Sequence, residues 1–461
     1  MNHGRVSFRL LESGRKFKPM DQSATLLLYR RAASRLCLLM LGFGLFSGTL
    51  AQPVVNPDRI LSNDIRSVRL HLNGDPLSMP ICRLNGGDRL ELHFDDLTAT
   101  VRSYYYTFQL CDFNWMPVNL STFDYIKGFT QQRITTYRIS TQSFTRYTHY
   151  QALIPDPQCM PSRSGNYLLK VFLDGDTSKT VFTRGMLVVD NRATVNVQMM
   201  QPFTPSLFRT HQRLRFTVNI DKLNAFNASQ QIKVRVLQNH RWDNAQGSLP
   251  PTFVRGNSLE YNNEASFVFP GGKEWRWLDL RSFRLLSDRI DSAANGKTTF
   301  NLYVKPDTDR SQQKYVYFQD LNGLYQVVTI DNVNPYWQTD YATVNFRYFP
   351  PDGRAYEGKD LFLFGQLTDY RPSAQSLMRY NSDSGYYSGQ LYLKQGFYNY
   401  AYALADKKNP AASFDLLEGN YWETENSYTV LVYYRGFTDQ SDQLIGIGRI
   451  TTRFDRPGIS F

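Results

Sequence analysis

The chain has 461 residues, a formal charge of +11 and 15% aromatic residues, most of them Tyr and Phe. This length exceeds what one hydrophobic core normally organises and predicts two to four domains. The abundance of Tyr and Phe favours extended β-structure. Four cysteines in 461 residues exclude a small scaffold held together by disulfides.

Residues 1–51 have the layout of a secretory signal peptide, with a basic segment before the short apolar run 36–51 and cleavage expected before Gln52. The apolar run is too short to favour a membrane span. This segment holds 8 of the 52 basic and 2 of the 41 acidic residues, so 44 basic and 39 acidic residues remain. The resulting charge of +5 argues against a nucleic-acid partner and indicates an ordinary mixed surface.

Short alternating strands with Gly, Asn, Asp and Pro between them follow the signal peptide. The stretches 65–72 and 88–97 alternate apolar and polar residues. The stretch 166–176 ends in an Asp-Gly turn signal and the stretch 180–190 follows it, so the two predict a hairpin. Together they predict an N-terminal β-sandwich over residues 58–191.

Two further sets of strands predict a middle β-rich domain over residues 195–335 and a C-terminal immunoglobulin-like sandwich over 336–461. The expected fold class is therefore all-β, with tandem immunoglobulin/fibronectin-like β-sandwich domains, three in number. One weak helix candidate, WLDLRSFRLLSDRI at 277–290, lies in the middle domain.

No pattern in the sequence supports catalysis, a metal or a cofactor, so we expect no enzyme activity, no catalytic or cofactor-binding residues, and no metal site. The five histidines after residue 51 lack the spacing of a metal-binding motif, and His149 is interpreted as structural. Asp95 and Asp96 are expected to close a turn at the end of a strand. Cys82, Cys111 and Cys159 leave open one disulfide or three buried thiols.

Aromatic residues are the better indication of binding. The stretch KEWRWLDLR places Trp275, Arg276, Trp277 and Arg281 close together, and Trp with Arg is a typical composition of protein interfaces. The alternative interpretation is a buried tryptophan pair with arginines that reach outward.

The C-terminal stretch 361–404 resembles the immunoglobulin-like modules of carbohydrate-binding domains. The rings that this resemblance makes available for stacking on sugars are Tyr370, Tyr380, Tyr386 and Tyr387. An exported glycan-binding protein that uses the C-terminal sandwich is therefore the alternative function.

The stretch RSYYYTFQLCDFNWMPVNLSTFDYIKGF at 102–129 resembles the plug protein family of the type IX secretion system. Similar patterns continue through 80–97, 164–176 and 269–290, so that the resemblance covers about residues 60–450. The resemblance implies an exported, periplasmic, all-β protein without cofactors, on the inner side of the outer membrane. Its implied partner is the giant outer-membrane β-barrel translocon, whose periplasmic opening the plug closes.

Within this stretch, alternation predicts that Tyr104, Tyr106, Phe108 and Leu110 face a sandwich core. Tyr105 lies on the opposite face and is the one ring of the stretch expected to meet a partner. Trp115 is expected to fold back as a lid on the core. The predicted partner-binding residues are thus Tyr105, Trp275, Arg276, Trp277 and Arg281.

Overall fold

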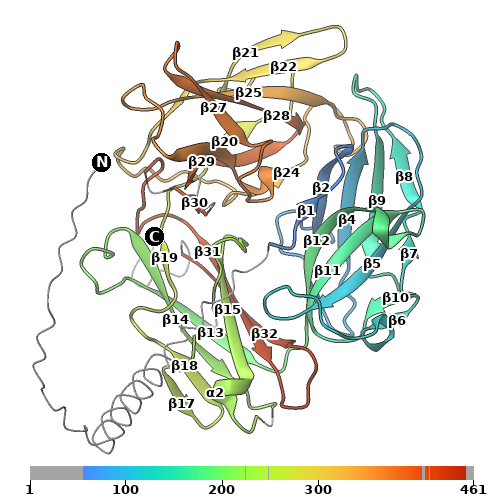
Figure 1. The fold of residues 1–461 in the computed structure, drawn as a ribbon, viewed down its shortest axis with the longest axis vertical. Helices are drawn as coiled ribbons and strands as arrows, with labels where there is room; N and C mark the ends of the chain where they lie inside the picture. Colours follow the sequence, from blue (N-terminus) through green and yellow to red (C-terminus); the bar gives the residue numbers. More distant parts are fainter. Residues whose placement is uncertain (1–55, 224, 248, 407–410, 415, 453–461) are drawn as a thin grey trace, which may run out of the picture. The chain divides into compact units, whose positions relative to one another are not determined.

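The computed structural model describes residues 56–223, 225–247, 249–406, 411–414 and 416–452. The predicted signal peptide, residues 1–51, lies outside these residues. In the part of the chain that is described, strands dominate and the helical segments are single turns (Figure 1). These turns are η1 (Thr122–Asp124), η2 (Thr177–Lys179), α2 (Ala228–Gln231) and η3 (Gln366–Thr368).

The first module, residues 56–190, is a sandwich of two antiparallel sheets with a small hairpin beside them. One sheet has the order β1 (Arg59–Ile60), β12 (Thr180–Val189), β11 (Gly165–Leu173), β5 (Tyr104–Cys111) and β7 (Gln132–Arg133), with β3 (Ile81–Arg83) parallel to β12. The other has the order β2 (Ile65–Leu72), β4 (Leu90–Asp96), β9 (Thr148–Ile154) and β8 (Thr136–Ile139). The small hairpin pairs β6 (Ile126–Gly128) with β10 (Cys159–Pro161).

The two large sheets of the first module enclose a core rich in aromatic residues, to which β5 contributes the predicted face. Tyr104, Tyr106, Phe108 and Leu110 are all buried in it. Tyr104 contacts Phe94 of the facing sheet edge to face, with the ring centroids 5.0 Å apart. The predicted core face of β5 is therefore confirmed.

The predicted hairpin is also confirmed, because β11 and β12 pair antiparallel along their length. Asp174 and Gly175 both have positive φ, 56° and 71°, at the exit of β11. Asp and Gly are among the residues that tolerate this left-handed conformation, which explains why they mark the turn.

The middle module combines residues 194–270 with residues 427–451. One sheet has the order β13 (Thr194–Met200), β14 (His211–Asn219), β18 (Ser258–Tyr261) and β17 (Phe253–Arg255), with β19 (Val268–Pro270) also on β14. The other has the order β16 (Gln246–Gly247), β15 (Ile232–Gln238), β31 (Ser427–Tyr434) and β32 (Gln443–Thr451). In Figure 1, β31, from the red end of the colour scale, lies beside the green strand β15, and β32 pairs with the other side of β31.

The third module, residues 276–418, is built on one eleven-stranded arrangement. Its main path has the order β20 (Arg276–Asp279), β29 (Phe397–Asp406), β26 (Lys359–Phe364), β27 (Leu377–Asn381), β28 (Tyr386–Lys394), β25 (Tyr341–Phe349), β22 (Phe300–Val304) and β21 (Ile290–Asn295). Short strands β23 (Asp307–Thr308), β24 (Tyr325–Gln326) and β30 (Ala412–Ser413) pair with β25 or β29. Its core contains Leu278, Leu302, Val344 and Tyr402.

The sheets divide the chain differently from the predicted ranges 195–335 and 336–461. Strands β31 and β32 lie in the predicted C-terminal range, yet Val430 and Ile445 pack in the core of the middle module. Strands β20, β21 and β22 lie in the predicted middle range, yet they pair within the third module. The chain crosses between the two modules twice because β15 completes its sheet with strands that are distant in sequence.

The predicted helix at 277–290 was wrong. Trp277 and Leu278 lie in β20, which pairs antiparallel with β29, and the residues after Asp279 form turns. Leu278 and Leu280 are buried while Trp277 and Asp279 are only partly so. This period of two is that of a strand with one face on a core.

An apolar cluster joins the first module to the middle module within the compact unit Pro53–Phe461. Trp115 is buried in this cluster and contacts Trp242 edge to face at 4.9 Å between ring centroids. Leu187 of β12 and Leu431 of β31 belong to the same cluster. The prediction that Trp115 covers the core of its own sandwich was therefore wrong, because the ring packs in the apolar junction between two modules. No helix among the described residues has both the length and the apolar character needed to cross a membrane.

The isolated segment 195–335 should not fold, because it lacks β31 and β32, which form half of the sheet around β15. We expect no cooperative thermal transition in circular dichroism of this fragment. A control chain that joins 194–270 to 427–452 through a flexible linker should unfold cooperatively. Cooperative unfolding of segment 195–335 by itself would contradict this assignment.

Candidate functional site

Tyr105 lies where the sequence placed it, on the outer face of the first sheet of the first module. Its ring is half-buried and lies parallel to that of Phe172 at 6.3 Å between centroids. Its neighbour across the strands is Arg133 of β7, the last strand of that sheet. Contact of Tyr105 with a partner stays a prediction.

Trp275 and Arg276 are buried, so neither side chain belongs to the exposed surface. Trp275 packs against Tyr370 and Phe414. Arg276 donates from Nη1 to Asp307 Oδ1 at 2.7 Å and from Nε to Glu418 Oε1 at 3.0 Å. The alternative interpretation of buried tryptophans holds for Trp275, whereas Arg276 does not reach outward but neutralises two buried carboxylates.

Trp277 and Arg281 stay nearer to the surface. Trp277 is partly buried and stacks on Phe397 at 6.3 Å between ring centroids. Arg281 is 42% exposed and forms a 2.6 Å ion pair with Asp279. The four residues of this stretch therefore do not form one interface patch. Trp277 and Arg281 remain available for contact.

The four rings proposed for sugar stacking are not all on the surface either. Tyr370 and Tyr387 are buried, and Tyr387 packs against Tyr380 and Tyr356. Tyr380 and Tyr386 are partly exposed. A flat aromatic platform made of all four rings is thus absent from the described third module.

A buried polar network joins the first module to the third module, and Asp95 is its centre. Asp95 does not close a turn: it lies at the end of β4 with no solvent exposure, and only Asp96 accepts the turn hydrogen bond, from Thr98 N. Asp95 Oδ1 lies 2.7 Å from His149 Nδ1 in the same module. Asp95 Oδ2 accepts hydrogen bonds from the Tyr341 hydroxyl at 2.6 Å and from Lys394 Nζ, both in the third module.

Opposite charges within this network compensate for the burial of Asp95 and Lys394. Burial by itself would raise the pKa of Asp95, but Lys394 and His149 outweigh it and lower the pKa below the ordinary value. Burial lowers the pKa of Lys394, while Asp95 acts in the opposite direction. Lys394 also lies over the rings of Tyr147 and Tyr341, at 4.3 and 5.6 Å from their centroids. The pair therefore functions as a structural lock between modules.

The hydrogen bonds that lead from Asp95 to His149 and on to His93 determine which ring nitrogens carry protons. A carboxylate accepts hydrogen bonds only, so in the neutral form of His149 the Nδ1 atom donates to Asp95 and the Nε2 atom is an acceptor. His93 Nδ1 lies 3.2 Å from that acceptor and therefore carries a proton. Burial lowers the pKa of His93 to about 2, with the charges of its neighbours acting in the same direction, so its ring is neutral. His93 Nε2 then carries no hydrogen and presents a lone pair.

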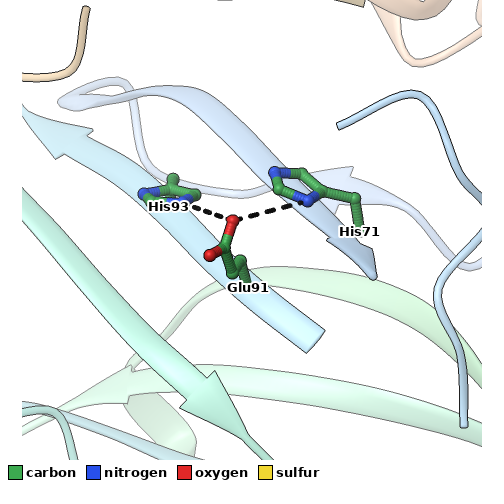
Figure 2. A group of neighbouring side chains, drawn as sticks. All are labelled: His71, Glu91 and His93. Atoms are coloured by element: carbon green, nitrogen blue, oxygen red, sulfur yellow. Dashed lines mark ion pairs between the residues drawn. The ribbon is translucent and has the colours of Figure 1, made fainter. Parts of the chain in front are cut away.

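Figure 2 shows what His93 Nε2 faces: the carboxylate of Glu91 lies between the rings of His93 and His71. Glu91 Oε2 is 3.7 Å from His93 Nε2 and 3.8 Å from His71 Nδ1. His71 Nδ1 also contacts the carbonyl oxygen of Leu72 at 3.0 Å. Glu91 and His93 are next-but-one neighbours on β4, and His71 is directly opposite Glu91 on β2.

The sequence patterns did not indicate this group. Glu91 and His93 share a strand face in the stretch LELHF, and this spacing was visible. The third member was not, because only the pairing register of β2 with β4 brings His71 opposite Glu91.

Cys82, Cys111 and Cys159 are free and buried in the structure. Burial raises the pKa of each thiol to about 12. Such thiols are protonated and inert at neutral pH, so the structure favours the interpretation of three buried small residues.

The first module also presents an exposed edge strand. β8 is the last strand of its sheet, and all four of its residues are exposed. Tyr137 and Ile139 are 40% and 54% exposed and lie on the same side of the strand. An edge with free backbone groups and apolar side chains is a ready surface for a partner.

Comparison with known proteins identifies the first module. Residues 65–190 match the family model described as the first domain of the type 9 secretion system plug protein. The match includes the stretch 102–129 and confirms the predicted resemblance. No curated protein matches the chain.

The fold extends over more than the matched module. The crystal structure of a hypothetical protein from Parabacteroides merdae ATCC 43184 is similar to this chain, with a TM-score of 0.82 and 26% sequence identity. The similarity covers 86% of this chain and 98% of that one. It confirms the predicted all-β class of tandem β-sandwich domains.

The substitution Lys394→Met should lower the free energy of unfolding by about 3–5 kcal/mol, because it leaves Asp95 as an uncompensated buried charge. Urea denaturation measures this change. The control is Lys179→Met, which breaks the ion pair with Asp174, exposed on both sides, and should change the free energy by less than about 1 kcal/mol. Equal effects of the two substitutions would contradict the proposed lock.

The substitution Glu418→Gln should make the free energy of unfolding depend less on pH in the acid range. Burial raises the pKa of Glu418, but Arg276 and Arg310 outweigh it and bring the pKa below its ordinary value of 4.5. The stabilisation by Glu418 is therefore complete above pH 4.5 and disappears as the pH falls through its lowered pKa. The difference in free energy of unfolding between wild type and variant should shrink from pH 7 to pH 3. Exposed Glu357→Gln is the control, and a constant difference for Glu418→Gln would refute the prediction.

Proposed function

Because residues 65–190 carry the first domain of the type IX secretion system plug family, we propose that this protein is a non-enzymatic plug of that system. It binds the giant outer-membrane translocon barrel and seals its periplasmic opening. This role requires export to the periplasm and a position against the inner side of the outer membrane. The family match is the observation that carries the proposal.

The joints between modules support a role that demands a stiff body. The first module is held to the third by the Asp95–Lys394 pair and to the middle module by the apolar cluster around Trp115. Arg184 of the first module adds a 3.2 Å ion pair with Asp369 of the third. Breaking either joint would expose buried charge or apolar surface, which opposes hinge motion.

The exposed edge strand β8 is the docking surface that we favour. It lies within the residues that match the plug family, whereas the exposed edge strand β17 of the middle module does not. An unpaired edge strand can form backbone hydrogen bonds with an extended segment of a partner. Tyr137 and Ile139 would supply apolar contact beside those bonds, in an interface small enough to be released.

Affinity-tagged protein should recover the translocon barrel from detergent-solubilised outer membranes. Deletion of the protein should make outer membranes with active export more permeable to large solutes, because the barrel is left open. Recovery of no large barrel, together with tight retention on polysaccharide, would favour the glycan-binding alternative. Unchanged permeability in the deletion strain would count against sealing.

Ile139→Asp should reduce recovery of the barrel at least fivefold, since it places a charge in the apolar part of the β8 edge. The matched control is Phe253→Asp on edge strand β17, where the side chain is exposed to 53%, close to the 54% of Ile139. Quantitative mass spectrometry of the recovered barrel measures both. If Phe253→Asp alone reduces recovery, the docking surface lies on the middle module instead.

A further inference from the structure

In the group His71, Glu91 and His93, one buried ring nitrogen makes no hydrogen bond with the described residues, whereas buried polar atoms in proteins normally have a partner. His93 is 6% exposed, and its Nε2 has no hydrogen-bond partner among the described residues. The proton assignment from Asp95 through His149 fixes this nitrogen as an acceptor. It faces a carboxylate oxygen, which is also an acceptor.

Two acceptors 3.7 Å apart repel each other unless a hydrogen-bond donor or a cation lies between them. A cation coordinated by the three side chains would satisfy both lone pairs at once.

The geometry suits such an ion. One ligand atom from each of the three residues lies within 4.8 Å of the others. Zinc binds imidazole nitrogen and carboxylate oxygen at about 2.0–2.2 Å, so that ligand atoms around it lie about 3.4 Å apart. The separations of 3.7 and 3.8 Å from Glu91 Oε2 need a contraction of about 0.4 Å to meet this geometry. The two histidine nitrogens lie within 4.8 Å of each other and need a larger contraction, of up to about 1.4 Å. His71 would exchange its contact with the Leu72 carbonyl for the metal.

The surroundings supply the further features of a metal site. His93 donates a hydrogen bond from its other ring nitrogen, Nδ1, to His149, and His149 donates one to Asp95. Such outer partners orient metal-binding histidines. Tyr336 covers His93, with the ring centroids 4.0 Å apart and the planes within 4° of parallel. The Glu91 side chain is 28% exposed, so ions can enter from solvent.

We propose that His71, Glu91 and His93 form a binding site for a single zinc ion, with a fourth position left for water. Zinc fits because two imidazoles and one carboxylate form a donor set that it commonly uses. The ion would fasten β2 to β4 beneath Tyr336, at the junction of the first and third modules. This inference does not depend on the plug function.

Titration of the chelator-treated purified chain with Zn²⁺ alone, in competition with a chromophoric chelator, tests the site. We expect one equivalent of zinc per chain and a rise in melting temperature on binding. Glu91→Gln and His93→Gln should each weaken zinc affinity at least tenfold. His211→Gln, a histidine of the middle module, should leave the affinity unchanged. Binding of no zinc, or equal affinity in wild type and both cluster variants, would overturn the proposal.

Co²⁺ in place of Zn²⁺ provides a readout that does not require a variant to fold. The wild-type chain with Co²⁺ should show the visible absorption bands of a four- or five-coordinate ion with nitrogen ligands. Only the weak spectrum of hydrated Co²⁺ would refute the site. Circular dichroism of each variant separates loss of ligands from loss of fold, and Glu91→Gln, at the partly exposed position, is the less disruptive change.

Discussion

The charge of Asp95 is the constraint on which the arrangement of this protein depends. A carboxylate without solvent exposure needs compensation, since its transfer out of water costs several kcal/mol. The first module supplies His149 by itself, and the third module supplies Lys394 and Tyr341. The compensation is complete only when the two modules are together. A buried ion pair adds little net stability in general, but it penalises every arrangement that separates its partners.

The two joints of the first module differ in physical character. The joint with the third module is polar and directional, because it consists of buried ion pairs and hydrogen bonds with fixed geometry. The joint with the middle module is largely apolar and owes its stability to the burial of Trp115, Leu187 and Leu431. The polar joint fixes the orientation of the two modules, and the apolar joint adds the burial of hydrophobic side chains.

The same charge also determines the chemistry at the outer face of the second sheet. Asp95 fixes the proton of His149, His149 fixes the proton of His93, and His93 is left with a lone pair toward Glu91. Thus a structural ion pair and the proposed zinc site are parts of one hydrogen-bonded chain. The exposed edge strand β8 lies in the same sheet, two strands from β4. Docking at the edge and metal binding on the face would therefore depend on the same rigid sheet.

The sequence by itself determined the all-β class, the hairpin at 165–189, the core face of β5 and the resemblance of the first module to the plug family. These follow from alternation and turn residues, which are local properties of the chain. Only the tertiary structure decided which strands that are distant in sequence become neighbours. Alternation assigns a side chain to a face but does not say what lies opposite, so the pairing of β15 with β31 and of His71 with Glu91 could not be predicted. For the same reason Trp275 and Arg276 resembled an interface in sequence, although the fold encloses them with Tyr370, Asp307 and Glu418.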